Sequence, residues 1–84
     1  MGRNIQVYGA KTCSDTRRSR QFLEAHDVAY SWIDVDDDAE GLERIKSVNN
    51  GNRATPTIFL QDGSILIEPS DDELAEKLGI QPNA

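Results

Sequence analysis

The hydrophobic positions of this chain change period along its length, and turn residues separate the segments. The first part of the chain shows a strand pattern, then a helix pattern, then a second strand pattern. We predict these elements at Asn4–Tyr8, Ser14–His26 and Tyr30–Val35. Within the first helix, the side chains predicted to face the core are Phe22, Leu23 and Ala25.

A second helix is predicted after the second strand. Asp37 or Asp38 would cap its first turn, because a carboxylate there accepts from free backbone N–H groups. Apolar residues then recur at helical spacing at Leu42, Ile45 and Val48. The segment Asn49-Asn50-Gly51 ends the helix, since Asn and Gly tolerate the left-handed conformation.

A hairpin and a last helix complete the chain. Pro56 precedes a strand at Thr57–Leu60, and Asp62-Gly63 is a turn signal that returns the chain along an antiparallel strand at Ser64–Ile67. The segment Ser70-Asp71-Asp72-Glu73 matches a capping box, so a helix begins there and ends before Gly79. The order βαβαββα predicts an α/β fold with a four-stranded mixed sheet flanked by three helices.

Composition narrows the class of protein. The chain has 84 residues, so we expect residues 1–84 to form one domain. Its net charge of −6 argues against a nucleic-acid binder. No stretch is apolar enough for a signal peptide or a membrane span, and one cysteine permits no intrachain disulfide. We therefore expect a cytoplasmic protein without a membrane partner. A basic cluster interrupts the acidic chain at Lys11, Arg17, Arg18 and Arg20.

The lone cysteine stands at the predicted start of the first helix. A helix N-terminus favours a thiolate through its unpaired N–H groups and its partial positive charge. Lys11 and Arg17, which is at position i+4 from Cys13, add positive charge, whereas Asp15 opposes ionisation. The polar neighbours favour an exposed thiol over a small buried hydrophobe. We expect a reactive Cys13 with a lowered pKa.

Thr16 stands at position i+3 from Cys13, where a dithiol site would have its second cysteine. Its hydroxyl can hydrogen-bond the sulfur but cannot attack a disulfide, so an outside thiol would have to resolve any disulfide at Cys13. An ordinary polar residue in the first helical turn explains Thr16 equally well. Only a few per cent of X–Pro bonds are cis, so Thr55-Pro56 taken alone favours a trans bond.

These residues together resemble the glutaredoxins, which have the thioredoxin-like fold, over nearly the whole chain. The matching features are a thiol between the first strand and helix, Thr-Pro before the third strand, a hairpin, and Ser-Asp at the last helix. The similarity is greatest to the mycoredoxin-like, monothiol branch, at Val48-Asn49-Asn50-Gly51-Asn52-Arg53-Ala54-Thr55-Pro56-Thr57-Ile58, Asp62-Gly63-Ser64 and Pro69-Ser70.

The resemblance implies roles for individual residues. Cys13 matches the nucleophile, and Pro56 matches a cis-proline opposite the thiol. Thr55 matches the residue whose backbone pairs with the cysteinyl part of a small thiol or substrate. Two cations, Lys11 and Arg53, match positions that contact a carboxylate of glutathione. Ser70 and Asp71 match the pair that holds the γ-glutamyl end, although capping explains Ser70 equally well. Arg17 is included with the residues that hold the anionic thiol.

The chain departs from the family at two places. Ser14-Asp15-Thr16 replaces the Pro-Tyr-Cys, Gly-Tyr-Cys or Gly-Phe-Ser of other members. Glu68-Pro69 replaces a Gly-Gly pair, which adds a negative charge where the γ-glutamyl carboxylate would sit. These changes count against glutathione and leave mycothiol, bacillithiol or a protein disulfide open.

The resemblance implies a glutaredoxin-like monothiol thiol–disulfide oxidoreductase. Cys13 would reduce mixed disulfides between proteins and a low-molecular-weight thiol, and a second small thiol would regenerate it. We expect a monomer with no tightly bound cofactor, whose partners are disulfide-containing or thiolated proteins. The small thiol (glutathione, mycothiol or bacillithiol) would be the cosubstrate.

Two other functions stay open. Two chains could each supply Cys13 to a [2Fe–2S] cluster with two external thiols, although Asp15 would add negative charge beside an anionic cluster. Cys13-Ser14-Asp15-Thr16-Arg17 also matches the local string of arsenate reductase-like enzymes.

No protein-bound metal is expected. Asp34, Asp36 and Asp38 alternate like a calcium loop, but Ala39 and Ile45 stand where that loop requires Gly and Glu. The end of a strand leading into an acidic helix start explains the run better. His26 has no Cys or His nearby in the sequence.

Overall fold

A computed structural model of the chain describes residues 4–80. Within them, all seven predicted elements occur in the predicted order, as β1 (Gln6–Gly9), α1 (Ser14–Ala25), β2 (Ser31–Asp34), α2 (Ala39–Ser47), β3 (Thr57–Phe59), β4 (Ile65–Ile67) and α3 (Asp71–Leu78). The observed ends differ from the predicted ends by one or two residues, because terminal turns and strand ends pair weakly.

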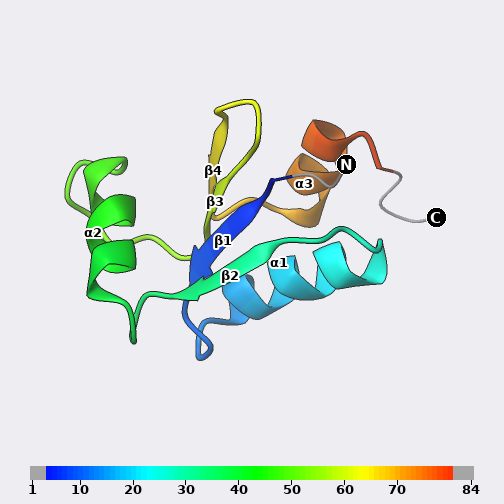
Figure 1. Cartoon of the computed structure of the whole chain (residues 1–84). Helices are drawn as coiled ribbons and strands as arrows, with labels where there is room; N and C mark the ends of the chain where they lie inside the picture. Colours follow the sequence, from blue (N-terminus) through cyan, green and yellow to red (C-terminus); the bar gives the residue numbers. More distant parts are fainter. Residues whose placement is uncertain (1–3, 81–84) are drawn as a thin grey trace.

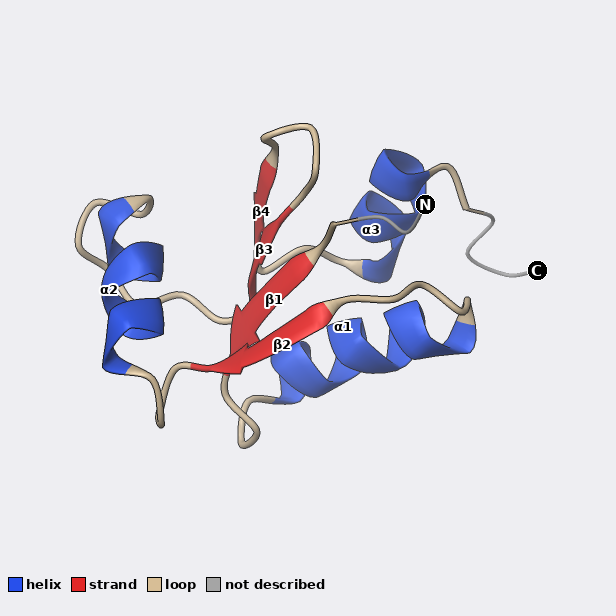
Figure 2. Cartoon of the chain, viewed as in Figure 1, coloured by secondary structure: helices blue, strands red, loops and turns tan. Residues whose placement is uncertain are grey.

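The strands form one mixed sheet in the order β2-β1-β3-β4 (Figure 1). β1 and β2 are parallel, whereas β3 runs antiparallel to both β1 and β4. The parallel pair is joined through α1, and the antiparallel pair β3–β4 is joined by the predicted hairpin, as Figure 2 shows. This is the predicted four-stranded mixed sheet with three helices.

The two faces of the sheet carry separate hydrophobic cores. Successive strand residues point to opposite faces, so Val7 belongs to one core and its neighbour Tyr8 to the other. The helices α1 and α3 pack together on the first face, and α2 covers the second face (Figure 1). The first core contains Ile5, Val7, Phe22, Leu23, Val28, Ile58, Leu74 and Ala75. The second contains Tyr8, Val35, Ile45 and Phe59.

The prediction that Ala25 faces the core is wrong. The buried stripe of α1 consists of Thr16, Ser19, Phe22 and Leu23. Ala25 is two positions beyond Leu23, which places it about 200° around the helix, and it is exposed. The polar residues Thr16 and Ser19 continue the buried stripe toward the N-terminus of α1, so apolar character alone did not identify the buried face.

The predicted caps are present. Asp38, one of the two candidates, caps α2 by accepting from the Gly41 N–H at 3.0 Å. Ser70 and Glu73 form the reciprocal capping box of α3, and Gly79 ends that helix with φ 70°. These local hydrogen bonds fix where the helices begin, and therefore where the loops that carry polar side chains leave the sheet.

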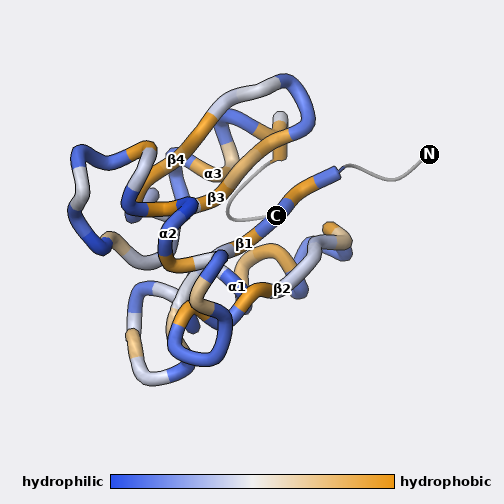
Figure 3. Tube along the Cα trace, turned by 60° about the vertical axis from the view of Figure 1, so that its left-hand side comes forward, coloured by the Kyte–Doolittle hydropathy of each residue, from blue (hydrophilic) through white to orange (hydrophobic). Residues whose placement is uncertain are grey.

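Hydropathy follows the layers of the fold. In Figure 3 the strands β3 and β4 are coloured mainly as hydrophobic, whereas the turn between them is polar or neutral. Of the helices within residues 4–80, none has the length and apolar character needed to cross a bilayer.

Candidate active site

Cys13 is the N-cap residue of α1 and is half-buried. Its backbone N–H donates to the Ala10 carbonyl at 3.0 Å, and its carbonyl accepts from the Arg17 N–H at 3.1 Å. The first bond closes the turn that follows β1, and the second begins the helix. The thiol is therefore fixed at the start of the helix, as the sequence predicts. Figure 1 shows the short loop that joins β1 to α1.

A second loop, between α2 and β3, forms the other side of the site. The Cys13 Sγ lies 3.5 Å from the backbone carbonyl oxygen of Thr55. The Thr55–Pro56 peptide bond is cis, as the resemblance implies and against the trans bond that the local sequence favours. Buried Thr57 donates through its hydroxyl to the Ala54 carbonyl at 2.8 Å, which holds this loop in shape.

The pKa of Cys13 is lowered, in the predicted direction. Burial by itself raises the pKa of this thiol, but hydrogen bonds from the Thr55 and Thr16 side chains and from the backbone N–H groups of Thr16 and Asp15 outweigh it. The backbone N–H groups are those that a helix N-terminus leaves free. Hydrogen bonds, more than the neighbouring cations that the sequence suggests, therefore stabilise the thiolate.

Thr16 is fully buried beneath the thiol. Its Oγ1 accepts from the Ala10 N–H at 3.4 Å and its hydroxyl hydrogen-bonds the Cys13 sulfur. Gly9 makes this packing possible, because a Cβ at that position would lie 2.6 Å from Thr16 Cγ2. The end of β1 and the first turn of α1 are thus packed too closely for a larger residue at position 9.

The two cations nearest to Cys13 in sequence have other partners. The Arg17 guanidinium donates to the Lys11 carbonyl at 2.9 Å, so it braces the loop before the thiol. The Lys11 ammonium is largely exposed and lies 4.0 Å from the Asp34 carboxylate at the end of β2. Both side chains remain at the rim of the site, where an anionic ligand could reach them.

Arg18 joins the start of α1 to the start of α3. Its guanidinium lies 3.1 Å from the Asp15 carboxylate and 3.8 Å from the Asp71 carboxylate. The sequence predicts that the negative charge of Asp15 opposes ionisation of Cys13. In the structure, the Arg18 guanidinium offsets that charge. The Ser70 hydroxyl accepts from the Glu73 N–H at 3.1 Å, so its capping role is confirmed.

The alternating carboxylates after β2 have separate partners. Asp34 accepts from the Asp36 N–H at 2.9 Å, Asp36 pairs with Arg53 at 2.9 Å, and Asp38 caps α2. Within residues 4–80, no group of three or more Asp, Glu, His or Cys side chains is placed to hold a metal ion. The run is thus a strand end that leads into a capped helix, as the sequence predicts.

The structure brings two of the predicted site residues directly to the thiol, namely Thr16 and Thr55, and Pro56 follows Thr55 through the cis bond. Lys11 and Arg53 stand on the two loops that flank it, Arg17 lies near the start of α1, and Ser70 and Asp71 stand at the start of α3. The sequence prediction missed the ion pairs of two further groups, Arg18 and the carboxylates of Asp34 and Asp36. The i,i+3 spacing of Asp15 and Arg18 could have signalled their ion pair, whereas no local pattern links Asp36 to Arg53.

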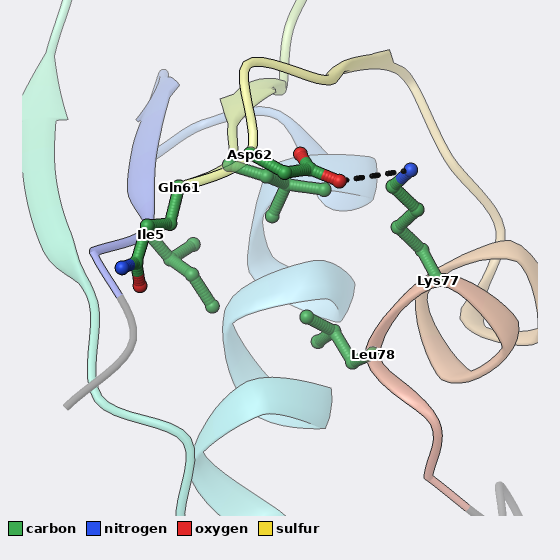
Figure 4. Close-up of a pocket in the computed structure, with 6 residues that line it drawn as sticks. Ile5, Gln61, Asp62, Lys77 and Leu78 are labelled. Carbon is green, nitrogen blue, oxygen red and sulfur yellow. Dashed lines mark ion pairs between the residues drawn. The ribbon is translucent and has the colours of Figure 1, made fainter. Parts of the chain in front are cut away.

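A cavity of about 430 Å³ lies elsewhere in the molecule. It is lined by Ile5, Leu60, Gln61, Asp62, Lys77 and Leu78, and an ion pair between Asp62 and Lys77 crosses its rim at 3.3 Å (Figure 4). Ile5 precedes β1, whereas Cys13 follows the other end of that strand. None of the predicted site residues lines the cavity, so it is separate from the thiol.

Comparisons with known proteins agree with this architecture. A family model described as Glutaredoxin matches residues 5–65. Mycoredoxin 1 of Corynebacterium glutamicum is 36% identical over 75 residues, which cover 89% of this chain and 92% of that protein. A Mycobacterium tuberculosis protein named as a glutaredoxin is 36% identical over 74 residues, which cover 88% of each chain.

A solved structure supports the fold independently. The crystal structure of a mutant of a thioredoxin-like protein matches with a TM-score of 0.81 and 28% sequence identity, over 92% of this chain and 96% of that one. The chain therefore belongs to the glutaredoxin family and has the thioredoxin-like fold.

Proposed function

We propose that this chain is a monothiol thiol–disulfide oxidoreductase that reduces mixed disulfides between proteins and a small thiol. The observation that carries the proposal is the environment of Cys13, whose pKa is lowered by the hydrogen bonds of Thr16 and Thr55 against the effect of burial. Cys13 is the one cysteine of the chain, so the second thiol of the reaction must come from outside.

The proposed reaction has two exchange steps. In the first, the Cys13 thiolate attacks the small-thiol sulfur of the mixed disulfide. The bond between that sulfur and the protein breaks, a disulfide forms between Cys13 and the small thiol, and the substrate protein leaves as a thiolate that takes up a proton. In the second, another small thiol loses its proton and attacks the same sulfur. Cys13 returns as a thiolate, and the two small thiols leave joined as a disulfide.

The remaining residues are assigned by their positions around the thiol. The Thr55 backbone would pair with the cysteinyl part of the small thiol next to Pro56. Lys11 and Arg53 on the flanking loops, together with Arg17 near the start of α1, would hold its anionic groups. Ser70 and Asp71 at the start of α3 would hold its far end, although the Ser70 hydroxyl is already engaged in capping.

The small thiol is proposed to be a cytoplasmic one. Glu68, which departs from the family pattern, has φ 50°. Its backbone N–H donates to the Pro56 carbonyl at 2.8 Å, so Glu68 lies next to the cis-proline. Its carboxylate adds negative charge there, which disfavours glutathione relative to mycothiol or bacillithiol. Because one thiol per chain suffices, the reaction requires only a monomer.

The test combines turnover with mass spectrometry. Wild type and Cys13→Ser are compared in the reduction of a protein mixed disulfide made with each small thiol. We expect turnover by wild type, none by Cys13→Ser, and a wild-type adduct at Cys13 whose mass identifies the preferred thiol. Full turnover by Cys13→Ser, or a Cys13 pKa at or above the ordinary thiol value of about 8.5, would contradict the proposal.

A further inference from the structure

The cations proposed to hold the anionic thiol are already paired with carboxylates of this chain. The Arg53 Nη2 lies 2.9 Å from the Asp36 Oδ1, and the Lys11 Nζ lies 4.0 Å from the Asp34 Oδ2. Asp34 is the last residue of β2 and Asp36 lies in the segment that joins β2 to α2, whereas the cations come from the two loops beside Cys13. An anionic ligand that uses these cations must compete with the protein's own carboxylates.

Of the two pairs, Asp36–Arg53 is the closer one. Its distance is that of a charge-assisted hydrogen bond, whereas 4.0 Å is only an ion pair at the limit of contact. Asp34 also has a structural role, because it accepts the Asp36 N–H. Within residues 4–80, the Asp36 carboxylate has Arg53 as its only ion-pair partner.

The position of Arg53 relates this pair to the reaction. Arg53 is two residues before Thr55, whose carbonyl lies 3.5 Å from the Cys13 sulfur. Both members of the pair are 46% exposed, so a ligand can reach the guanidinium and displace the carboxylate. An exposed pair of this kind holds its partners by only about 0.2–1 kcal/mol, which corresponds to a factor of about 1.4 to five in a binding constant.

We propose that Asp36 is a specificity-determining residue that competes with the carboxylate of an anionic thiol for Arg53. The site would consequently gain less affinity from a carboxylate at that end of a small thiol, so its preference for thiols that carry one would be reduced. This inference rests on the proposed function, because it requires that Arg53 faces the small thiol.

Two unreactive probes separate the carboxylate effect from the chemistry at Cys13. S-methylglutathione keeps both carboxylates of glutathione, and its glycyl ethyl ester lacks one of them. Binding of each to the full chain is followed by NMR titration. We expect Asp36→Asn to bind S-methylglutathione about 1.4- to fivefold more tightly than wild type, with a smaller change for the ester. Arg53→Gln added to Asp36→Asn should remove the gain.

Asp37→Asn is the matched control. Asp37 is exposed and adjacent to Asp36, and within residues 4–80 its carboxylate forms no ion pair. Each of the two variants removes one negative charge, so they have the same net charge. We expect Asp37→Asn to leave the ratio of the two dissociation constants unchanged. An equal gain in both variants would indicate a general charge effect and overturn the inference. An unchanged dissociation constant in Asp36→Asn, or no detectable binding to any variant, would overturn it too.

Turnover distinguishes the two proposals. If Cys13 of wild type forms an adduct and turns over while Asp36→Asn behaves as wild type, the specificity inference fails and the proposed function stands. If Asp36→Asn binds S-methylglutathione more tightly but Cys13→Ser retains full turnover, the proposed reaction fails and the competition at Arg53 stands. In an active enzyme, Asp36→Asn should lower KM for glutathione and leave kcat unchanged, because Asp36 acts on binding alone.

Discussion

The sulfur of Cys13 lies 3.5 Å from the backbone carbonyl oxygen of Thr55, although the two residues are 42 positions apart. The contact joins the loop after β1 to the loop before β3, which the sheet places side by side because β1 and β3 are neighbours. Part of the thiol's surroundings therefore comes from a segment that is far from the cysteine in the sequence. The following predictions test how these surroundings work.

Thr16→Val should raise the pKa of Cys13. The change keeps the shape of the side chain but removes the hydroxyl that hydrogen-bonds the sulfur and accepts the Ala10 N–H. Leaving that buried N–H without a partner should also cost about 1–3 kcal/mol in the free energy of unfolding. The alkylation rate of Cys13 as a function of pH measures the pKa, and Thr16→Ser, which keeps the hydroxyl, is the control. An unchanged pKa in Thr16→Val would exclude the side-chain contribution.

Arg18→Gln should lower the free energy of unfolding by about 0.2–1 kcal/mol, because the ion pairs of Arg18 with Asp15 and Asp71 are nearly half exposed. The loss should be smaller in an Asp15→Asn background, where one partner is already neutral. Urea unfolding of the four proteins in this double-mutant cycle measures the coupling. Strictly additive losses would show that Arg18 and Asp15 do not interact.

Ser70→Ala should destabilise the protein by about 0.5–2 kcal/mol, because it removes the side-chain acceptor of the capping box. Ser70→Asp, which supplies another good N-cap acceptor, should retain most of the stability. Urea unfolding measures both variants. If Ser70→Asp is stable but binds the small thiol less well, Ser70 has a ligand role beside capping; if it unfolds as easily as Ser70→Ala, the capping explanation is wrong.

The ionisation of Asp62 should make the free energy of unfolding depend on pH in the acid range. The Ser64 backbone N–H, which donates at 2.9 Å, is the main cause that lowers the Asp62 pKa to about 2, and the Ser64 side chain and Lys77 assist. Since the folded pKa is below the unfolded value of about 3.9, ionised Asp62 stabilises the folded state above pH 4. That contribution falls as the pH decreases from 4 through 2.

Asp62→Asn provides the comparison for this pH dependence. Its amide oxygen can still accept from Ser64, so chiefly the charge is lost. The difference in unfolding free energy between wild type and the variant should be largest above pH 4 and shrink toward pH 2, as measured by urea unfolding across that range. An NMR titration that places the Asp62 pKa near 3.8 would refute the prediction.

The local parts of the fold are those that the sequence predicts well. Asp38, the capping box of Ser70 and Glu73, and the left-handed Gly79 are determined by contacts within a few residues of each other. The misplaced Ala25 shows the limit of such patterns. Its apolar side chain suggested the core, but the α1 stripe that meets the sheet is continued by the polar residues Thr16 and Ser19.

The candidate site divides in the same way. The place of Cys13 at a helix N-terminus follows from its neighbours in the chain, whereas its lowered pKa depends also on Thr55, which is 42 positions away. The sequence alone did not predict the cis bond before Pro56; the family resemblance was needed for that. The pairing of Asp36 with Arg53 had no local signal, because the two side chains meet only when β2 and the loop before β3 converge.

By itself, the sequence determined a lone thiol at the start of a helix in a βαβαββα chain, because strand and helix periodicity, caps and turns act over short distances. Only the tertiary structure decided which groups surround that thiol. Thr55 reaches the sulfur, Arg18 offsets Asp15, and Asp36 pairs with Arg53. The two longer contacts depend on how the sheet brings loops together, which the pattern of neighbouring residues does not determine. The Asp15–Arg18 pair is local, but only the fold brings Arg18 to Asp71 at the start of α3 as well.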